Sequence, residues 1–484
     1  MALADDRGTR PARSETITLA VDLDGTLLRT DVLYESLATL LKRPWVLVPL
    51  AWHLLRGKAA FKAELARRVE VDVERLPANA VLLEWLRRER DDGRLLALYS
   101  AADDSVVRRV AQRFGIFDHA QGSDGKVNLA GARKHAAIVA RYGPAFAYAG
   151  DSRRDLPIWD GCRTAVLVGD VERLRRQLPN SVVIERTFPA PAGRARCWMR
   201  ALRLHQWVKN LLVFVPLLLS GYRAPDPLVA SLLAFIVLSL MASATYIVND
   251  LTDLAADRMH PVKRERPFAS GALPIRSGLF AIPILLGLAA LPLAWLPARF
   301  VAVAVVYLVC TLAYSLRLKK APILDLILIA FMFTLRIVAG MVAIDAAVSP
   351  WLLTFSMFFF FSVAAIKRYD EVRLMASRND AEVAGRGYRA LDGPFLMALG
   401  LTTAVSSTLV FFIYLVDPAS PSREYARPQL MWIICIVLAY WLGRAWLLAS
   451  RGAMHIDPVL FALRDRVSLF LGAVTLIVSV AARW

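Results

Sequence analysis

A chain of 484 residues that is 57% hydrophobic, with 59 Lys and Arg against 41 Asp and Glu, is long enough for two or three domains and too apolar to be wholly water-soluble. Its formal net charge of +18 would suggest nucleic acid in a soluble protein. Apolar runs near membrane-spanning length instead indicate anionic lipid or phosphate partners and no nucleic acid. The four cysteines lie far apart with no Cys-x-x-Cys, which excludes a zinc knuckle and a disulfide framework and indicates a reducing compartment.

The first 205 residues are expected to form a soluble α/β domain. The first twenty are charged and lack an apolar core, so no cleaved signal is expected. Short apolar runs that end in polar turns predict strands at 17–21, 95–99 and 145–149, with helical patterns between them. A stretch rich in proline and basic residues then predicts a linker, which divides the chain into a domain at 1–190, a linker at 191–205 and a membrane domain at 206–484.

Nine apolar segments follow the linker, each near the length that crosses a hydrocarbon core of about 30 Å, although the first and last are short. They cover residues 207–222, 227–249, 275–296, 298–314, 323–347, 350–368, 395–417, 428–449 and 466–482. The predicted fold class is therefore an α/β domain followed by an all-α membrane domain of nine helices.

The connections between these segments differ in charge. The even-numbered connections hold most of the Lys and Arg, whereas the odd-numbered ones hold only Arg223, Arg299, Arg423 and Arg427. By the positive-inside rule, we expect the basic connections and the N-terminal domain on the cytoplasmic side of a bacterial inner membrane.

An acidic motif ends the second apolar segment. Asn249, Asp253 and Asp257 are four residues apart, so on a helix they face one side, with Asp250 beside them. Clustered carboxylates at a membrane boundary repel each other unless cations lie between them, and hard oxygen ligands suit Mg²⁺ bridging to a diphosphate. A helix end with solvated carboxylates is the alternative.

Four basic clusters accompany this motif. Any one of them is explained by charges that anchor a helix end to lipid headgroups, but all four around an acidic cluster indicate a polyanion site. The clusters are 203–210 before the first segment, 258–266 after the second, 314–320 after the fourth and 367–373 after the sixth.

These motifs, in this order, resemble the UbiA superfamily of intramembrane prenyltransferases, and the resemblance covers about residues 200–484. Four short sequence segments resemble, more narrowly, the decaprenyl-phosphate phosphoribosyltransferase branch of this superfamily: 206–210, 249–257, 260–267 and 367–371. That branch transfers 5-phosphoribose from phosphoribosyl diphosphate to a polyprenyl phosphate and releases diphosphate. The wider family has a second aspartate-rich motif after its sixth helix; here that place holds Lys367, Arg368 and Glu371, which favours the phosphoribosyl branch.

The resemblance implies a role for each matching residue. Asn249, Asp250, Asp253 and Asp257 would hold Mg²⁺ and the leaving diphosphate, and Asn249, Asp253 and Asp257 are the expected catalytic residues. The expected substrate-binding residues are Lys209, Lys263, Arg264, Arg266 and Lys319 at the donor phosphates, Lys367, Arg368 and Arg373 at the acceptor or 5-phosphate, and Tyr314 and Glu371.

A further motif, Asp22-Leu23-Asp24-Gly25-Thr26, follows the first predicted strand. It resembles the first motif of the haloacid dehalogenase superfamily, which implies a Rossmann-like domain with a small helical cap. The resemblance implies that Asp22 is a nucleophile that forms an aspartyl-phosphate and that Asp24 is the general acid and base. It also implies a phosphate-binding Ser100, a phosphate-neutralising lysine, for which Lys134 is preferred over Lys126, and a second Mg²⁺ site made by Asp22, Asp24, Asp151 and Asp155.

Residues 29–72 lie where that superfamily inserts its cap. Within them, the apolar stretch 44–55 is too short to span a bilayer. Two interpretations stay open: a buried cap core, and an interfacial helix with its tryptophans at headgroup level, flanked by Lys42, Arg43, Arg56 and Lys58.

The two halves together predict a bifunctional enzyme that makes polyprenyl-phosphoryl-ribose for cell-envelope glycan synthesis. Phosphoribosyl transfer would come first, and the α/β domain would then remove the 5-phosphate. One alternative is a prenyltransferase that joins an isoprenoid diphosphate to an aromatic acceptor. Another is a lipid-binding scaffold or transporter with an inactive haloacid dehalogenase-like domain. A homo-oligomer is left open.

Overall fold

The computed structural model describes residues 17–42, 44–55, 57–191, 193–220, 224–376, 387–417, 420, 425–454 and 457–483. Most of the first twenty residues, for which no cleaved signal is expected, lie outside the described residues. Arg43, Arg56, Arg223 and Arg423 also lie outside them. The chain forms two compact units: Met1–Leu202 with Ile247–Ala281, and Arg203–Tyr246 with Ile282–Trp484. The first unit therefore contains the expected α/β domain and also the segment that carries the acidic motif.

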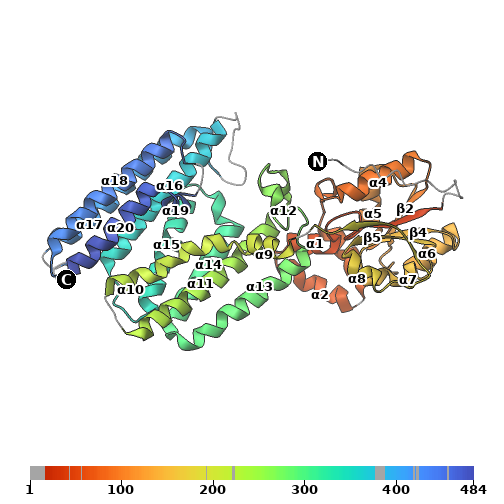
Figure 1. Ribbon diagram of the computed structural model, residues 1–484, viewed down its shortest axis with the longest axis horizontal. Coiled ribbons are helices and arrows are strands. Elements are labelled where there is room, and N and C mark those ends of the chain that lie inside the picture. Colours follow the sequence, from red (N-terminus) through yellow and green to blue (C-terminus); the bar gives the residue numbers. More distant parts are fainter. Residues whose placement is uncertain are drawn as a thin grey trace, which may run out of the picture. The chain divides into compact units, whose positions relative to one another are not determined.

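A six-stranded parallel sheet organises the first unit, in the order β3-β2-β1-β4-β5-β6 (Figure 1). The predicted strands at 17–21, 95–99 and 145–149 are confirmed as β1, β2 and β4. The strand bounds are β1 Leu19–Asp22, β2 Leu96–Asp103, β3 His119–Ser123, β4 Ala147–Gly150, β5 Thr164–Gly169 and β6 Val183–Pro189. The central strands β1 and β4 are buried throughout because helices cover both faces of the sheet, as is usual for parallel sheets.

Alternate residues of each strand point to opposite faces, so the sheet has two cores. Leu19 and Val21 pack on one face with Trp85 and Val107, whereas Ala20 packs on the other with Trp159. The covering helices are α4 Ala80–Asp91, α5 Asp104–Phe114, α6 Ala132–Tyr142, α7 Leu156–Trp159 and α8 Val171–Arg175.

The order of the strands reverses beside β1: β2 and β3 lie on one side of it, and β4, β5 and β6 on the other. At such a switch point the connections leave the sheet in opposite directions and open a crevice at the carboxyl ends of the strands. The crevice here lies between the ends of β1 and β4.

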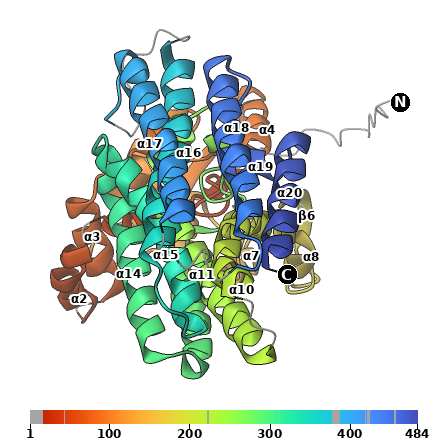
Figure 2. The same cartoon turned by 90° about the vertical axis from the view of Figure 1, so that its left-hand side faces the viewer.

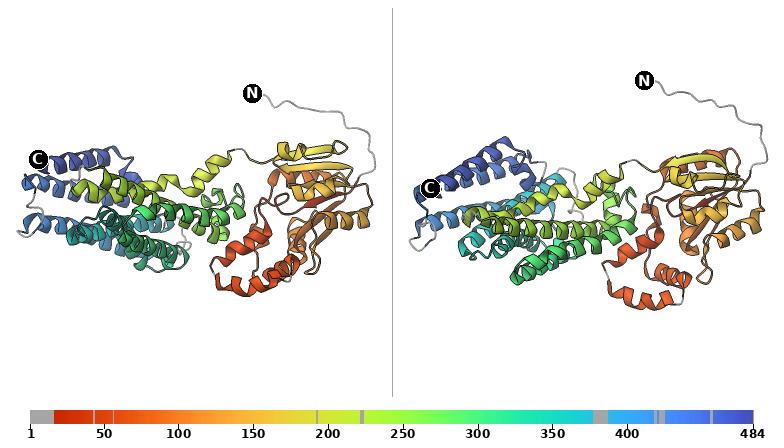
Figure 3. Two further views of the ribbon diagram at one scale, coloured as in Figure 1. Left: turned by 90° about the horizontal axis from the view of Figure 1, so that it is seen from below. Right: turned by 60° about the horizontal axis from the view of Figure 1, so that its bottom comes forward.

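Of the four α-helices between β1 and β2 in the described residues, three lie outside the two layers that cover the sheet (Figure 3): α1 Val32–Leu40, α2 Leu47–Leu55 and α3 Lys58–Arg68. Leu50 of α2 is fully buried in a small core with Leu40, Leu65 and Val69. Trp45 and Trp52 are 58% and 61% exposed. This segment therefore supplies both a cap core and an exposed aromatic face, and its interfacial role stays a prediction.

The segment Ile247–Ala281 packs in the same unit as the α/β domain, through helix α12 Leu254–Met259 and the start of helix α13 Ile275–Ala290. Arg258 of α12 forms a buried ion pair with Glu35 of α1, with Nη2 and Oε1 2.5 Å apart. Trp198 of helix α9, Arg194–Leu202, meets the ring of Phe268 edge to face.

The described residues contain eight helices that are long and apolar enough to cross a membrane. Helices that follow one another in the chain largely pack as neighbours, as α16 and α17 do in Figure 2. The candidate spans are Pro225–Thr252, Ile275–Trp295, Ala298–Leu316, Leu324–Ala343, Pro350–Ala376, Ala390–Val416, Pro428–Ser450 and Arg466–Arg483. The long helices within them are α11 Pro225–Thr252, α13, α14 Ala298–Leu316, α15 Leu324–Ala343, α16 Pro350–Ala376, α17 Gly393–Val416, α18 Met431–Ser450 and α20 Arg466–Arg483.

The first predicted span, at 207–222, is not confirmed. Its place is taken by a 3₁₀ helix, Leu204–Phe214, and the short helix α10 Val215–Ser220. Pro216 has no backbone N–H to donate to the carbonyl four residues earlier, and its ring clashes with that carbonyl. A continuous α-helix through this stretch is therefore disfavoured.

Candidate active sites

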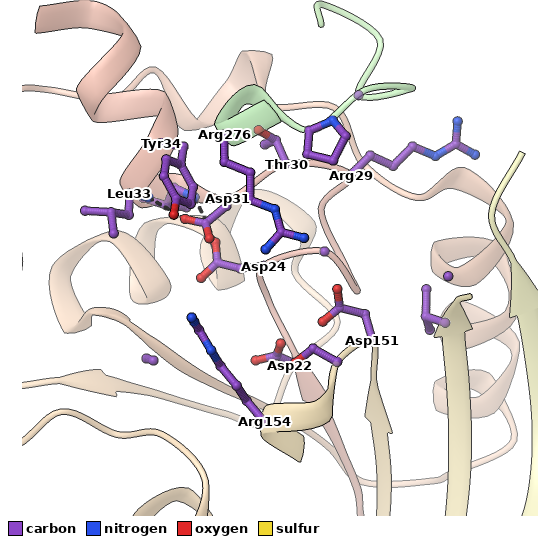
Figure 4. Close-up of a pocket in the computed structure, with 18 of the residues that line it drawn as sticks. Asp22, Asp24, Arg29, Thr30, Asp31, Leu33, Tyr34, Asp151, Arg154 and Arg276 are labelled. Carbon is purple, nitrogen blue, oxygen red and sulfur yellow. Dashed lines mark hydrogen bonds between the residues drawn. The ribbon is translucent and has the colours of Figure 1, made fainter. Parts of the chain in front are cut away.

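The crevice between β1 and β4 gathers three carboxylates, two of which, Asp22 and Asp151, are labelled in Figure 4. Asp22 is the last residue of β1, Asp151 directly follows β4, and Asp155 ends the next turn. Each offers one oxygen, and these three oxygens all lie within 4.8 Å of one another. Within the described residues, no other group of three or more acidic, His or Cys side chains converges this closely.

Gly25 makes room for this arrangement. Its φ of +80° belongs to the left-handed region, and a Cβ at this position would collide with the carboxylate of Asp151. The glycine of the Asp-x-Asp-Gly-Thr motif thus lets the turn after β1 pass directly beside Asp151.

Lys134 of α6 lies in the same site. Its Nζ is 2.5 Å from Asp22 Oδ1 and donates a hydrogen bond of 3.0 Å to the hydroxyl oxygen of Tyr148. That hydroxyl donates in turn to Asp155 Oδ1 at 2.8 Å. The alternative lysine, Lys126, is exposed and does not line this pocket. Lys134, the preferred lysine, thus lies against Asp22, and its role at a phosphate stays a prediction.

Asp24 lies outside the three-carboxylate group, although the sequence also suggested it as a metal ligand. Its Oδ1 accepts from the backbone N–H of Val32 at 2.9 Å, and its Oδ2 accepts from Ser100 Oγ at 3.1 Å. Burial, and the nearby charges of Asp31 and Asp22, raise the pKa of Asp24 to about 8. A carboxyl group that keeps its proton near neutral pH suits a general acid better than a metal ligand.

The electrostatics of the three carboxylates fit a divalent cation. Burial raises the pKa of Asp22 to about 6, against the opposing charge of Lys134. Burial and the charges of Asp22 and Asp155 raise the pKa of Asp151 well above its ordinary value. A hard cation such as Mg²⁺ would relieve this repulsion, and carboxylate oxygens are the ligands it prefers.

The acidic motif of the same unit is bent rather than one straight helix. Helix α11 ends at Thr252, and Asp253 is the residue before α12. Backbone hydrogen bonds of 3.0 Å from Asp253 to Asn249 and 2.8 Å from Asp257 to Asp253 carry the helical spacing across the bend. Lys42 approaches Asp253 at 3.8 Å.

Arg266 lies between two of these acids. Its Nη1 is 3.1 Å from Asp250 Oδ1 and 2.7 Å from Asp257 Oδ2, and both aspartates are buried. Burial raises the pKa of Asp257, although Arg266 opposes this. Lys263 and Arg264 lie in the 3₁₀ turn Lys263–Glu265 that leads to Arg266. One member of the predicted cation clamp, Arg266, is therefore in direct contact with two of the predicted metal ligands.

Two predicted substrate lysines of the second unit share a partner that the sequence did not suggest. Lys209 Nζ and Lys367 Nζ lie 2.9 and 3.2 Å from the same oxygen, Oδ2 of Asp457. Together the two lysines hold the pKa of Asp457 well below its usual range, despite its burial. The available signal was Asp457-Pro458, which begins helix α19 Pro458–Ala462.

Arg368 and Glu371 lie in a buried network instead of beside these lysines. Arg368 is 1% exposed, and its Nε is 2.6 Å from Asp325 Oδ2, a residue that the sequence analysis missed. Its remaining nitrogens bond Glu371 and the hydroxyl of Tyr314, while Tyr388 donates to Asp325 at 2.5 Å. A contact of Arg368, Glu371 or Tyr314 with substrate stays a prediction.

Other predicted and missed residues complete the second unit. Lys319 lies in the 3₁₀ turn Leu318–Lys320, and Arg373 packs where Gly452 has no side chain. Arg336, in the middle of α15, donates to Asn210 and to the hydroxyl of Tyr307, both at 2.8 Å. An arginine inside an apolar helix is itself a signal of a polar site within the membrane, and sequence reasoning passed over it.

Known proteins resemble the C-terminal half of the chain more often than the N-terminal half. The sequence model of the UbiA prenyltransferase family matches residues 211–477. A protein of Sinorhizobium fredii named Uncharacterized protein y4nM is 39% identical over 94% of this chain and 89% of its own length. The decaprenyl-phosphate phosphoribosyltransferase of Mycobacterium tuberculosis is 32% identical over 57% of this chain and 91% of its own length.

Two further likenesses concern the helical half. Nodulation protein NoeC of Azorhizobium caulinodans is 36% identical over 56% of this chain and 88% of its own. A solved UbiA homolog from Archaeoglobus fulgidus, bound to DMAPP and Mg²⁺, covers 59% of this chain and 98% of its own, with a TM-score of 0.46 and 16% identity. The match over residues 211–477, together with the eight apolar helices, identifies the chain as a multi-pass membrane protein that belongs to the UbiA prenyltransferase family.

Proposed function

We propose that the UbiA-type half transfers 5-phosphoribose from phosphoribosyl diphosphate to a polyprenyl phosphate. The observation that carries this proposal is the likeness, over most of their length, to relatives named decaprenyl-phosphate phosphoribosyltransferase. The contact of Arg266 with Asp250 and Asp257 supports it, because a diphosphate site needs cations beside metal-binding acids. We also propose that the basic connections and the α/β domain face the cytoplasm of a bacterial inner membrane.

In this reaction an oxygen of the lipid phosphate forms a bond to C1 of the ribose while the bond from C1 to the diphosphate oxygen breaks. Asn249, Asp250, Asp253 and Asp257 would hold Mg²⁺, which when bound neutralises charge that develops on the diphosphate. Arg266, Lys263, Arg264 and Lys319 would orient the donor phosphates. Lys209 and Lys367 share one aspartate, so a phosphate that displaces Asp457 would find two cations already converging on it.

The first test is transfer itself. Purified full-length protein is incubated with phosphoribosyl diphosphate and a polyprenyl phosphate, and diphosphate release and the mass of the lipid product are measured. Asp253→Ala is expected to abolish transfer while the protein stays folded. Near-normal turnover in this variant would contradict the site. Diphosphate release only with an isoprenoid diphosphate and an aromatic acceptor would favour the alternative prenyltransferase, and release with no substrate pair would favour a scaffold or transporter.

We further propose that the α/β domain is a haloacid dehalogenase-like phosphohydrolase that removes the 5-phosphate of the transfer product. The observation that carries this proposal is the convergence of Asp22, Asp151, Asp155 and Lys134 at the switch point of the sheet. A domain boundary near residue 190 and a small cap made by α1–α3 belong to the same proposal.

The residues account for each step of a two-stage hydrolysis. Asp22 attacks the phosphorus atom and forms an aspartyl-phosphate while the bond to the ribose oxygen breaks, and Asp24 gives that oxygen its proton. Water then attacks the aspartyl-phosphate, Asp24 takes up a proton of the water, and inorganic phosphate leaves. Ser100 and Lys134 would hold the phosphoryl oxygens, and Mg²⁺ bound by Asp22, Asp151 and Asp155 would supply charge neutralisation.

The second test uses the same lipid product. Wild-type protein is expected to yield lipid-linked ribose without the 5-phosphate, and Asp22→Asn is expected to accumulate the 5-phospho product with transfer unchanged. Accumulation of the 5-phospho product by the wild type, with no change in Asp22→Asn, would reject the phosphohydrolase and leave the transferase proposal untouched.

A further inference from the structure

The pocket around Asp22 has a wall that the α/β domain does not supply. Gly271, Ala272, Pro274, Ile275 and Arg276 line it together with the aspartates, and all of them belong to the first compact unit. These residues lie within 211–477, the stretch that matches the UbiA family, whereas Asp22 and Asp24 lie in the first strand and its turn. One half of the sequence thus lines the pocket of the other.

This wall is held in place by specific contacts. Arg258, whose side chain is 10% exposed, donates to both carboxylate oxygens of Glu35 and to the carbonyl of Ala269. Gly271, with a φ of +73°, passes so close to Arg29 that a Cβ at this position would meet the Arg29 carbonyl oxygen at 2.7 Å. The segment that leads to Arg276 is therefore packed against helix α1 and the turn after β1.

Two exposed arginines face the carboxylates from different walls. In Figure 4 the guanidinium group of Arg276 points toward the part of the pocket that holds Asp24 and Asp31, and Arg154 points toward the same carboxylates from the opposite wall. Among the described residues, neither arginine forms an ion pair within 4 Å, although the charge of Arg154 acts on Asp31. Their donors are therefore available to an anion that enters the pocket.

The cavity is large for a single phosphate. Its volume is about 1490 Å³, whereas small-molecule sites usually measure about 300–1,000 Å³. Ser100 and Lys134 already provide for the phosphoryl group that Asp22 would attack. Further cations across a wide pocket indicate a second anionic group on the same substrate.

We propose that Arg276 binds a second anionic group of the substrate, the phosphodiester on C1 of a ribose whose 5-phosphate lies at Asp22. This inference rests on the proposed function and names the part of the substrate that the pocket distinguishes. The phosphohydrolase then selects a 5-phosphoribose that is already linked through phosphate over one that is not. The selecting residue comes from the transferase half, at the start of α13.

The test compares two soluble substrates of the full-length protein, each with a 5-phosphate on ribose. One carries a methyl phosphodiester at C1, which a monoester hydrolase does not cleave, and the other an uncharged methyl group. Phosphate release gives kcat/KM for each. Arg276→Gln is expected to lower the kcat/KM for the phosphodiester substrate, relative to that for the uncharged methyl substrate, by about 10- to 100-fold. This is the effect of losing a charge-assisted hydrogen bond to an anion.

Arg29→Gln is the matched control, because Arg29 lines the same pocket but its side chain points away from the aspartates in Figure 4. It is expected to leave the ratio unchanged. An equal loss for both substrates in Arg276→Gln, or no loss for either, would overturn the proposed subsite.

Failure of the proposed function has a different signature. It would show as hydrolysis that persists in Asp22→Asn or that is absent from the wild type. The subsite is then tested by equilibrium binding of the C1 phosphodiester to the Asp22→Asn protein with and without Arg276→Gln. Affinity that does not depend on Arg276 rejects the inference, and an affinity lower by about 10-fold or more supports it.

Discussion

At the scale of single residues, the site of the α/β domain depends on a glycine that has no side chain as well as on its charged residues. Gly25 has a positive φ and no side chain, and the carboxylate of Asp151 occupies the space that a Cβ would take. Asp22 and Asp24 are fixed by their position at the end of β1 and in the turn after it. The carboxylate of Asp151 can approach them only because Gly25, in this turn, has no side chain.

Gly25→Ala is therefore expected to lower phosphate release by about 100-fold or more, because a displacement of about 1 Å at a catalytic group has that effect. Gly93→Ala is the matched control: Gly93 has a φ of +88° and nothing within 4 Å of an added Cβ. It costs about 1–2 kcal/mol of backbone strain with no loss of activity. Equal activity losses in both variants, measured with equal thermal stability, would contradict the steric explanation.

A second residue-scale question concerns Arg368, which was expected at the substrate and lies buried against Asp325. Removing one partner of a buried ion pair leaves an uncompensated charge and costs about 3–5 kcal/mol, whereas replacing both by apolar groups is often neutral. Arg368→Met is expected to reduce the yield of folded protein. The double variant Arg368→Met with Asp325→Leu is expected to restore part of that yield and of transfer, because Glu371 and Tyr388 still lose a partner. A double variant that folds normally but transfers no ribose would show that Arg368 also binds substrate.

At the scale of elements, the edge strand β6 is held to the sheet by more than its ladder. Arg94, which follows α4, donates to both oxygens of Glu185 on β6 and to the carbonyl of Ile17 just before β1. The guanidinium group thus joins an edge strand to the central strand region from a nearly buried position. One charged pair connects three elements that are far apart in the sequence.

This pair predicts acid sensitivity of β6. Burial opposes the ionisation of Glu185, but the hydrogen bonds and charge of Arg94 outweigh it and lower the pKa of Glu185 below its ordinary 4.5. Its contribution to stability is therefore present above pH 4.5 and is lost as the pH falls through the lower, folded-state pKa. Glu185→Gln is expected to reduce amide exchange protection of β6 at pH 7 by about 1.5–3 kcal/mol and to flatten its loss between about pH 5 and pH 3.

Glu84→Gln is the control for this prediction, because Glu84 pairs with Arg88 on an exposed helix face. Exposed pairs of this kind contribute little, so protection and its pH dependence are expected to stay unchanged. If the amide exchange protection of β6 were equal in Glu185→Gln and in the wild type at every pH, this pair would have no role in holding β6.

At the scale of the whole molecule, two observations lead to an expected path of the chain through the membrane. The α/β domain and the segment 253–274 belong to one compact unit, so we expect them on one side of the membrane. Helix α11 has 28 residues and a length of about 42 Å, so we expect it to enter that segment from the other side. On this path, residues 204–220 are also expected to cross the membrane.

The irregular stretch is long enough to do so. Eleven residues of 3₁₀ helix rise about 22 Å and six of α-helix about 9 Å, close to the hydrocarbon thickness of about 30 Å. We therefore expect nine crossings, eight by long helices and one by residues 204–220. With the native cysteines replaced by serine, Asp226→Cys and Val262→Cys are expected to react with a membrane-impermeant thiol reagent from opposite sides. Labelling of both from the same side would show that 204–220 does not cross.

Much of this protein could be predicted from sequence because the relevant signals are local. Apolar runs gave the central strands and eight of the nine expected spans, and Asp22, Asp24 and Gly25 are neighbours in one turn. The spacing of Asn249, Asp253 and Asp257 is likewise a property of one stretch of backbone, and it survives the bend at Asp253. Such features depend on residues within about one or two turns, so composition and periodicity reveal them.

What only the tertiary structure decided is which distant residues meet. Lys134 lies 112 residues from Asp22, Asp457 lies 248 from Lys209, and the Arg258 that anchors the wall of Arg276 lies 223 from Glu35. No periodicity links such positions, because their proximity results from the strand order, the packing of helices and the burial of opposite charges against one another. The sequence by itself determined the motifs and the apolar elements, and the packing of those elements determined which cation faces which acid.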